Sequence, residues 1–170
     1  MTGSAAKGAK GSGGGKVNRR AVARSAARLG AVQALYQMEV AGAPLEDVLA
    51  DFSSRRVGEA FEDGECGEPD QALLKDIVRG VVRGQTDIDR SVNRHLAEKW
   101  KLPRLDATVR AILRAAGYEL MFRYDIPPRV VISEYVDVAR AFHEGGDEPG
   151  FVNGVLDALA REKRADELHG

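Results

Sequence analysis

The sequence predicts an all-α protein of about six or seven helices. Hydrophobic residues recur at intervals of three and four along most of the chain, which is the period of an α-helix. No segment alternates hydrophobic and polar residues between turn signals, as a half-buried strand would. Because the chain has 170 residues, 44% of them hydrophobic, it is long enough for one domain with a substantial core.

The first helix is predicted from Arg19 through at least Tyr36, where Ala, Leu, Arg and Gln predominate and Pro is absent. Residues 1–17 are rich in Gly, Ser, Ala and Lys, which predicts a disordered tail. After a Gly/Pro break, the apolar positions of residues 45–52 predict a second helix. Six acidic residues and no basic one between residues 59 and 70 predict a solvent-exposed loop.

The third predicted helix begins at Gln71 and keeps its apolar residues on one side as far as Val92. Its length and its hydrophobic stripe indicate the central core helix. Gly80 and Gly84 lie inside it, and each disfavours a helix interior. Either close packing of another backbone or a break near Gly84 would explain these two glycines.

The remaining chain predicts three more helices. The helical pattern resumes after Pro103 and ends at the DIPP sequence. A helix follows in which Ser133 is expected to cap the start or to lie in the first turn. Pro149 is placed to start the last helix. The last two helices are expected at residues 129–142 and 151–162, the whole domain at 18–163, and a short tail at 164–170.

Nothing in the sequence predicts a catalytic centre, a metal site or a cofactor. His95, His143 and His169 are far apart, and none has a Cys or another His at metal-ligand spacing. The single cysteine, Cys66, excludes a disulfide within the chain and indicates a reducing compartment. No segment has the character of a signal peptide or a membrane span, so we expect a cytoplasmic protein without a membrane partner.

Charge is divided unevenly along the chain. The net charge is only −1, but residues 1–38 contain seven basic residues and no acidic one. Arg20, Arg24 and Arg28 follow one another at i, i+4 and i+8, which places three mutually repelling guanidinium groups on one face of the helix. They also oppose the helix dipole. The pattern predicts a polyanion partner, with a merely solubilising tail as the alternative.

Three motifs resemble those of the NusB family of transcription antitermination factors. They are AVQALYQME in the first helix, WKLPRLDATVRAILRAAGYEL in the middle, and FVNGVLDALA near the end. The resemblance runs in order from about Arg19 to Arg161. It implies two small helical bundles, binding of the boxA element of ribosomal RNA leader transcripts, and pairing with NusE, a ribosomal small-subunit protein, in the RNA polymerase antitermination complex.

The resemblance indicates residues that bind RNA, and the net charge of −8 on residues 39–170 indicates residues that bind the partner. Proteins of this family use an arginine-rich start of the chain against RNA, and unstacked bases need aromatic or guanidinium partners. For Phe151 a plain core position is an equal alternative, and for Tyr36 a core or protein-contact position is favoured. The basic NusE is expected to dock on the acidic remainder of the chain. The expected RNA-binding residues are Lys16, Arg19, Arg20, Arg24, Arg28, Tyr36, Phe151 and Asn153, and the expected partner-binding residues are Asp87, Asp89 and Glu119.

Some positions depart from the family pattern, and alternatives remain. Gly150 stands where family members usually have Lys or Arg, which removes one expected phosphate contact, and Ser133-Glu134 stands where an Asn-Glu pair is frequent. Methyl transfer, known where a NusB-like domain precedes a methyltransferase, is not expected because a Gly-rich cofactor-binding region is absent. The strongest alternative is a protein-interaction module of the same fold that does not bind RNA, for example a homodimer that masks the basic face.

Overall fold

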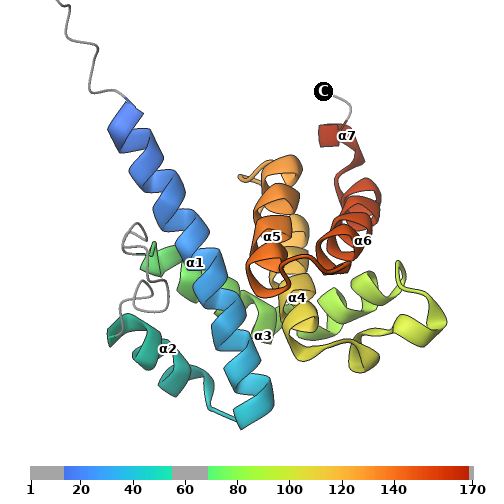
Figure 1. Ribbon diagram of the computed structural model, residues 1–170, viewed down its shortest axis with the longest axis horizontal. Helices are drawn as coiled ribbons and strands as arrows, with labels where there is room; N and C mark the ends of the chain where they lie inside the picture. Colours follow the sequence, from blue (N-terminus) through green and yellow to red (C-terminus); the bar gives the residue numbers. More distant parts are fainter. Residues whose placement is uncertain (1–13, 55–68, 169–170) are drawn as a thin grey trace, which may run out of the picture.

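The computed structural model describes residues 14–54 and 69–168. All regular structure in these residues is helical, which confirms the predicted class (Figure 1). The elements are α1 (Gly14–Ala41), α2 (Leu45–Ser54), α3 (Gln71–Asn93), the short 3-10 helices η2 (Glu98–Trp100) and η3 (Leu102–Arg104), α4 (Ala107–Phe122), α5 (Pro128–Phe142), α6 (Glu148–Lys163) and α7 (Ala165–Leu168).

Helix α4 lies at the centre of the domain. It packs against α1, α3, α5 and α6, and ten of its 16 residues are buried. The Asp106 carboxylate starts the helix by accepting hydrogen bonds from the backbone N–H groups of Thr108 and Val109. The expectation that the segment beginning at Gln71 is the central helix is therefore wrong. Helix α3 has a single buried face, which it packs mainly against α1 and α4, whereas α4 is covered on nearly all sides.

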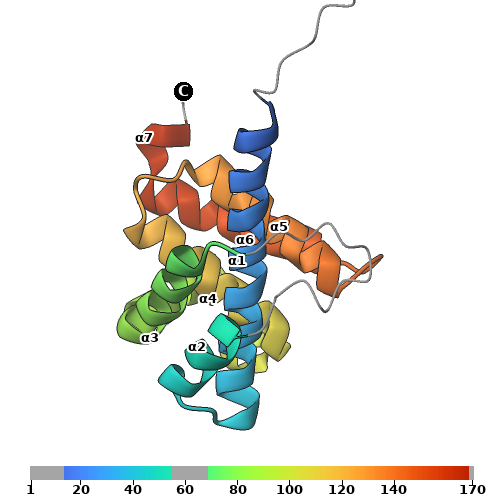
Figure 2. The same ribbon diagram turned by 90° about the vertical axis from the view of Figure 1, so that its left-hand side faces the viewer.

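Two groups of helices meet at α4. Helices α1, α2 and α3 pack against one another, and α5, α6 and α7 form a second mutually packed set (Figures 1 and 2). Helix α1 also touches α5, so the two groups share an interface beside α4. This arrangement agrees with the two small bundles that the family resemblance implies. Among the described helices, none has the length and apolar composition that crossing a membrane requires.

The two glycines of α3 make room for aromatic rings of α4. A Cβ on Gly80 would lie 2.1 Å from Cε2 of Tyr118, and one on Gly84 would lie 3.3 Å from Cε2 of Phe122. These two rings stack with their centroids 5.8 Å apart. Helix α3 is continuous through both positions. Close packing therefore explains the glycines, but the close neighbours are side-chain rings and not a second backbone.

The element boundaries differ from the expected ones at several places. Helix α1 begins at Gly14, so residues 14–17 are helical and do not belong to a disordered tail, while residues 1–13 lie outside the described part. At the other end Arg164 is buried and donates to the carbonyl oxygens of Arg123 and Tyr124, and α7 follows it. The segment after residue 163 is thus packed structure as far as Leu168.

Three sequence-based expectations concern the starts of α6 and α5 and the loop before α3. Pro149 occupies the first turn of α6, as predicted, although the helix begins one residue earlier. Ser133 lies in the second turn of α5 and does not cap it, because the helix starts at Pro128. Most of the expected acidic loop, with Cys66, lies outside the described residues, and its last residue, Asp70, caps α3 by accepting from the N–H of Leu73.

Candidate nucleic-acid interface

The three arginines spaced four residues apart on α1 pass from solvent into the core. The N-terminal part of this helix projects beyond the other helices (Figures 1 and 2). Arg20 is exposed, Arg24 is half-buried, and Arg28 is only 2% exposed. The three side chains share one face of the helix, as predicted, but the part of this face that carries Arg28 packs against the rest of the domain. Arg19 is exposed beside Arg20, and Lys16 lies in the first turn of α1, with its side chain outside the described part.

Arg28 forms an ion pair with Glu119 inside the core. Its Nε and Nη2 atoms lie 3.0 and 2.9 Å from the two carboxylate oxygens of Glu119, which is fully buried. The Tyr135 hydroxyl donates to the same carboxylate, so the cluster joins α1, α4 and α5. Burial by itself lowers the pKa of Arg28, but the hydrogen bond and charge of Glu119 outweigh it and raise that pKa. Burial raises the pKa of Tyr135 well above its usual value, and the charge of Glu119 adds to this.

Two expectations are therefore wrong. Arg28 does not face RNA phosphates, and Glu119 is not on a surface that a protein partner could reach. Each is retained in the core because the other neutralises it, since an unpaired buried charge is very unfavourable. The sequence holds a signal for this. Arg28 continues the buried stripe of Ala31, Val32 and Leu35 at helical spacing, although its charge suggests a surface position.

A contact on the protein surface connects the basic end of α1 with α5. The Ser25 hydroxyl donates to the Glu134 carboxylate over 2.7 Å, and Nη1 of Arg28 lies 3.9 Å from the same carboxylate. Glu134 belongs to the Ser133-Glu134 pair that departs from the family pattern. This contact ties α1 to α5 at the residue that follows Arg24.

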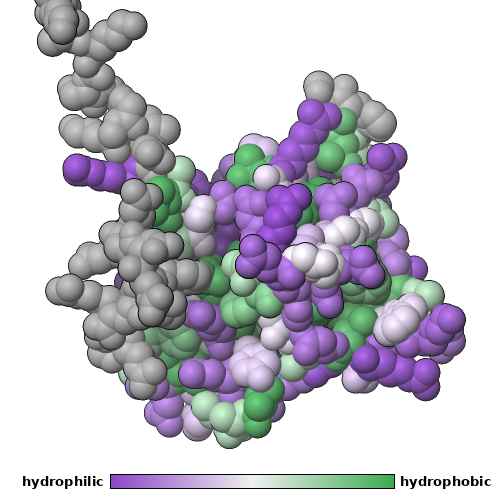
Figure 3. Space-filling model, viewed as in Figure 1, coloured by the Kyte–Doolittle hydropathy of each residue, from purple (hydrophilic) through white to green (hydrophobic). Residues whose placement is uncertain are grey.

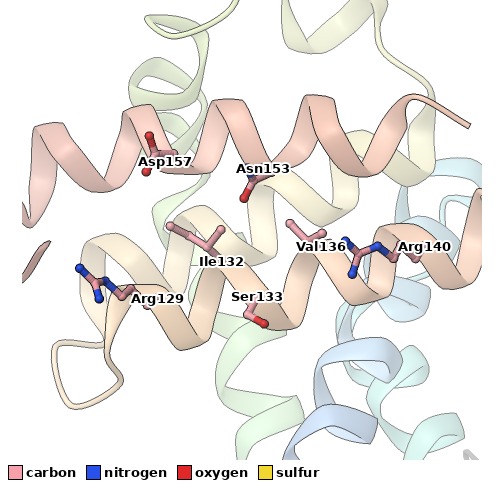
Figure 4. Close-up of a pocket in the computed structure, with 7 residues that line it drawn as sticks. All are labelled: Arg129, Ile132, Ser133, Val136, Arg140, Asn153 and Asp157. Carbon is pink, nitrogen blue, oxygen red and sulfur yellow. The ribbon is translucent and has the colours of Figure 1, made fainter.

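A groove of about 360 Å³ runs between α5 and α6 (Figure 4). Asn153, one of the expected RNA-binding residues, lines it from α6, and its side chain is directed toward α5. Hydrophilic side chains gather over these two helices on the face seen in Figure 3. The lining residues are Arg129, Ile132, Ser133, Val136, Arg140, Asn153 and Asp157.

The two aromatic candidates lie in different places. Phe151 is half-buried on α6 and packs against the core, so a structural role accounts for much of its ring. Tyr36 is 39% exposed on the far half of α1. It follows Arg24 by 12 residues, or about 18 Å along the helix axis. The structure therefore does not gather Tyr36 with the exposed arginines, and no observation assigns either ring to RNA.

The expected partner-binding acids do not form one patch. Asp89 is half-buried and accepts from Nε and Nη2 of Arg114 at 2.9 and 3.0 Å. Arg114 also lies 3.3 Å from Glu39, so the charge of Asp89 belongs to a surface ion network. Asp87 is exposed and lies 3.7 Å from Arg90. With Glu119 buried, Asp87 is the most accessible of the three.

Comparison with known proteins agrees with this architecture. The sequence model described as the NusB family matches residues 25–161. The chain belongs to the NusB family. It is 52% identical over 153 residues to the transcription antitermination protein NusB of Rhodopseudomonas palustris (strain BisB18), covering 90% of each chain. It is 50% identical over 141 residues to NusB of Caulobacter vibrioides, covering 83% of this chain and 94% of that relative.

Solved structures show the same NusB fold. A T. maritima NusB structure superposes with a TM-score of 0.67 at 30% identity, covering 89% of this chain and 97% of the other. A structure described as antitermination factors NusB and NusE in complex with dsRNA gives a TM-score of 0.65 at 25% identity, covering 81% and 96%. The relatives are named as antitermination proteins, which bears out the expectation that this NusB-family chain is not an enzyme.

Proposed function

We propose that this NusB-family protein binds the boxA element of ribosomal RNA leader transcripts together with NusE, and so supports ribosomal RNA transcription as part of the RNA polymerase antitermination complex in the cytoplasm. The observation that carries the RNA part is the exposed basic end of α1. Arg19 and Arg20 are exposed, Arg24 is half-buried, and no acidic residue precedes Glu39 in the chain. A polyanion would relieve the repulsion within this segment.

The RNA surface that we propose differs in part from the set expected from the sequence. Lys16, Arg19, Arg20 and Arg24 contact phosphates, and Asn153 contributes from α6. Arg28 supports this surface indirectly, because its bond to Glu119 holds α1 against α4 and α5. Tyr36 and Phe151 remain candidates for base stacking.

NusE is proposed to dock away from this basic end. Residues 39–170 carry 18 basic and 26 acidic residues, and a ribosomal protein is expected to be basic. On α3, the exposed Asp87 and the half-buried Asp89 contribute to this docking surface. If NusE also touches the RNA, each ligand strengthens binding of the other by the same factor. A related complex of NusB and NusE with dsRNA supports joint binding.

The direct test measures fluorescence anisotropy of a labelled single-stranded boxA RNA with the full chain, with and without NusE. Exchanging Arg20 and Arg24 for Glu should abolish binding, while the wild type should lose affinity with salt at a slope of roughly −0.7 per phosphate contact. A matched control exchanges Arg83 and Arg104, both exposed and far along the chain from the basic end, for Glu. Equal RNA affinity in the two double variants would refute the proposal.

The same experiment addresses the alternative function. A protein-interaction module would bind NusE normally and would show no RNA binding in either condition. Sedimentation at several protein concentrations then tells whether a homodimer masks the basic face. In that case RNA binding would appear only on dilution.

A further inference from the structure

The groove between α5 and α6 combines three kinds of lining group. Ile132 and Val136 form an aliphatic floor between the two helices (Figure 4). Asn153 directs an amide from α6 toward α5, and Ser133 places a hydroxyl at the outer edge of the groove, on the side of α5 away from α6 (Figure 4). Each of these groups can both donate and accept hydrogen bonds. Both side chains belong to exposed residues. A planar group that is apolar on its face and polar at its edge matches such a lining.

Two arginines stand at opposite ends of the groove. Arg129 and Arg140 are both on α5, eleven residues apart, so they lie on the same side of the helix and about 16 Å from each other along its axis. Arg129 has no carboxylate partner among the described residues and donates to the carbonyl of Leu168. Arg140 pairs with Asp137 at 3.0 Å, and both side chains are about two-thirds exposed. Exposed pairs of this kind contribute little, so a phosphate can replace Asp137.

The groove lies on the same helix as the contact between α1 and α5. Glu134, which accepts from Ser25 of α1, is the neighbour of Ser133 in the groove. Beyond Arg129 the hollow continues toward α7, where a second cavity of about 440 Å³ shares Arg129, Ile132 and Asp157 with the first. A strand bound at Arg24 would have to cross α5 beside the Glu134 carboxylate to enter the groove.

We infer that the α5–α6 groove holds one unstacked base of the bound single-stranded RNA. The base lies against Ile132 and Val136, Asn153 and Ser133 bond its edge, and Arg129 and Arg140 hold the phosphates on either side. Recognition of single strands commonly combines such a base contact with cationic groups along the backbone. This inference rests on the proposed RNA binding and adds a base-binding site to the phosphate contacts of α1.

Other occupants fit less well. A phosphate alone would leave the aliphatic floor uncovered. An apolar peptide segment would cover Ile132 and Val136, and its backbone could bond Asn153, but it would bring no negative charge to Arg129 and Arg140. A group with an apolar face, a polar edge and a flanking negative charge uses every lining residue named here except Asp157, whose carboxylate accepts from Nε of Arg161 over 2.9 Å.

The test combines an abasic scan of the RNA with a variant that fills the groove. Single-stranded boxA RNAs that lack one base each, with the backbone intact, are bound to the full chain and to Ser133→Phe. Because Ser133 is exposed at the outer edge of the groove, the larger side chain should obstruct the groove without unfolding the protein, which far-UV circular dichroism checks. Gln85→Phe, also exposed on a helix but on α3, is the control for added bulk.

One RNA position should report the site. In the wild type and in Gln85→Phe, loss of that base should weaken binding at least about fivefold. Ser133→Phe should bind the intact RNA more weakly by a similar factor. Removing the same base should then change the affinity of this variant little, because the two changes remove the same interaction and are not additive. Asn153→Ala, on the opposite wall, should show the same coupling.

Each other outcome overturns the inference. If every abasic RNA loses the same affinity in Ser133→Phe as in the wild type, no base occupies the groove, although the proposed function stands as long as RNA binding depends on Arg20 and Arg24. If Ser133→Phe weakens binding of NusE and not of RNA, the groove belongs to the protein partner. If the wild type binds no intact RNA in either condition, the proposed function fails together with the inference.

Discussion

Replacing Arg28 should destabilise the whole domain and should not act as a local loss of an RNA contact. Arg28→Met keeps a side chain of similar length but leaves the Glu119 carboxylate buried, with Tyr135 as its remaining hydrogen-bond partner. Removing one partner of a buried pair typically costs about 3–5 kcal/mol of unfolding free energy. For a domain of this size each kcal/mol lowers Tm by roughly 2–4 °C, so a fall of about 6–20 °C is expected.

The assay is urea or thermal unfolding followed by far-UV circular dichroism, with Arg24→Met as the matched control. Arg24 is one turn earlier on the same helix and half-buried, and its replacement should change stability by no more than about 0.5 kcal/mol. The two variants should rank in the opposite order in RNA affinity. At a temperature where both variants are folded, Arg24→Met should bind RNA more weakly than the wild type, and Arg28→Met should bind nearly as well.

Removing both buried charges should recover most of the stability that the single replacement loses. Arg28→Met combined with Glu119→Leu removes both charges, and such apolar replacements are often neutral or stabilising. The Tyr135 hydroxyl would still lack its acceptor, at a cost of about 1–3 kcal/mol, so adding Tyr135→Phe should bring stability back near the wild type. If Arg28→Met unfolds with the same midpoint as Arg24→Met, the buried ion pair does not stabilise this fold as argued.

Two further predictions concern packing and acid stability. Gly80→Ala should lower the free energy of unfolding by about 1–3 kcal/mol, because its Cβ would overlap the buried Tyr118 ring. Gly84→Ala faces the exposed Phe122 ring, which can move, so this variant should be as stable as the wild type or slightly more stable. Equal unfolding midpoints of the two variants in urea would contradict the close approach seen at Gly80. The hydrogen bond from Arg110 holds the pKa of Glu39 below its ordinary value of 4.5. The stability that this pair contributes is therefore present above pH 4.5 and is lost as the pH falls further, because the unfolded chain then binds a proton more readily than the folded protein does. Unfolding midpoints at pH 7 and pH 3 should therefore differ less in Glu39→Gln than in the wild type, and an equal difference would show that the pair does not contribute.

Much of the fold could be predicted from the sequence because its causes are local. The spacing of apolar residues identifies the helices between Gln71 and Lys163, and Pro149 marks the start of the last long one. The boundaries were less accurate at the chain ends, where α1 extends back to Gly14. That extension has a composition typical of a tail, and a helix already formed from Arg19 onward can propagate into such a segment at little cost.

The sequence by itself determined that the start of the chain is basic and that no acidic residue precedes Glu39, since both depend only on the order of the residues. Only the tertiary structure decided which charges remain accessible. Arg28 and Glu119 are 91 residues apart in the chain. The helical spacing of each residue indicates a core position, whereas its charge indicates a surface position. Burial of a charge is favourable only when its partner is in place, and a groove exists only when two helices have packed with particular side chains between them. Both facts depend on contacts between distant segments, which no local pattern of residues contains.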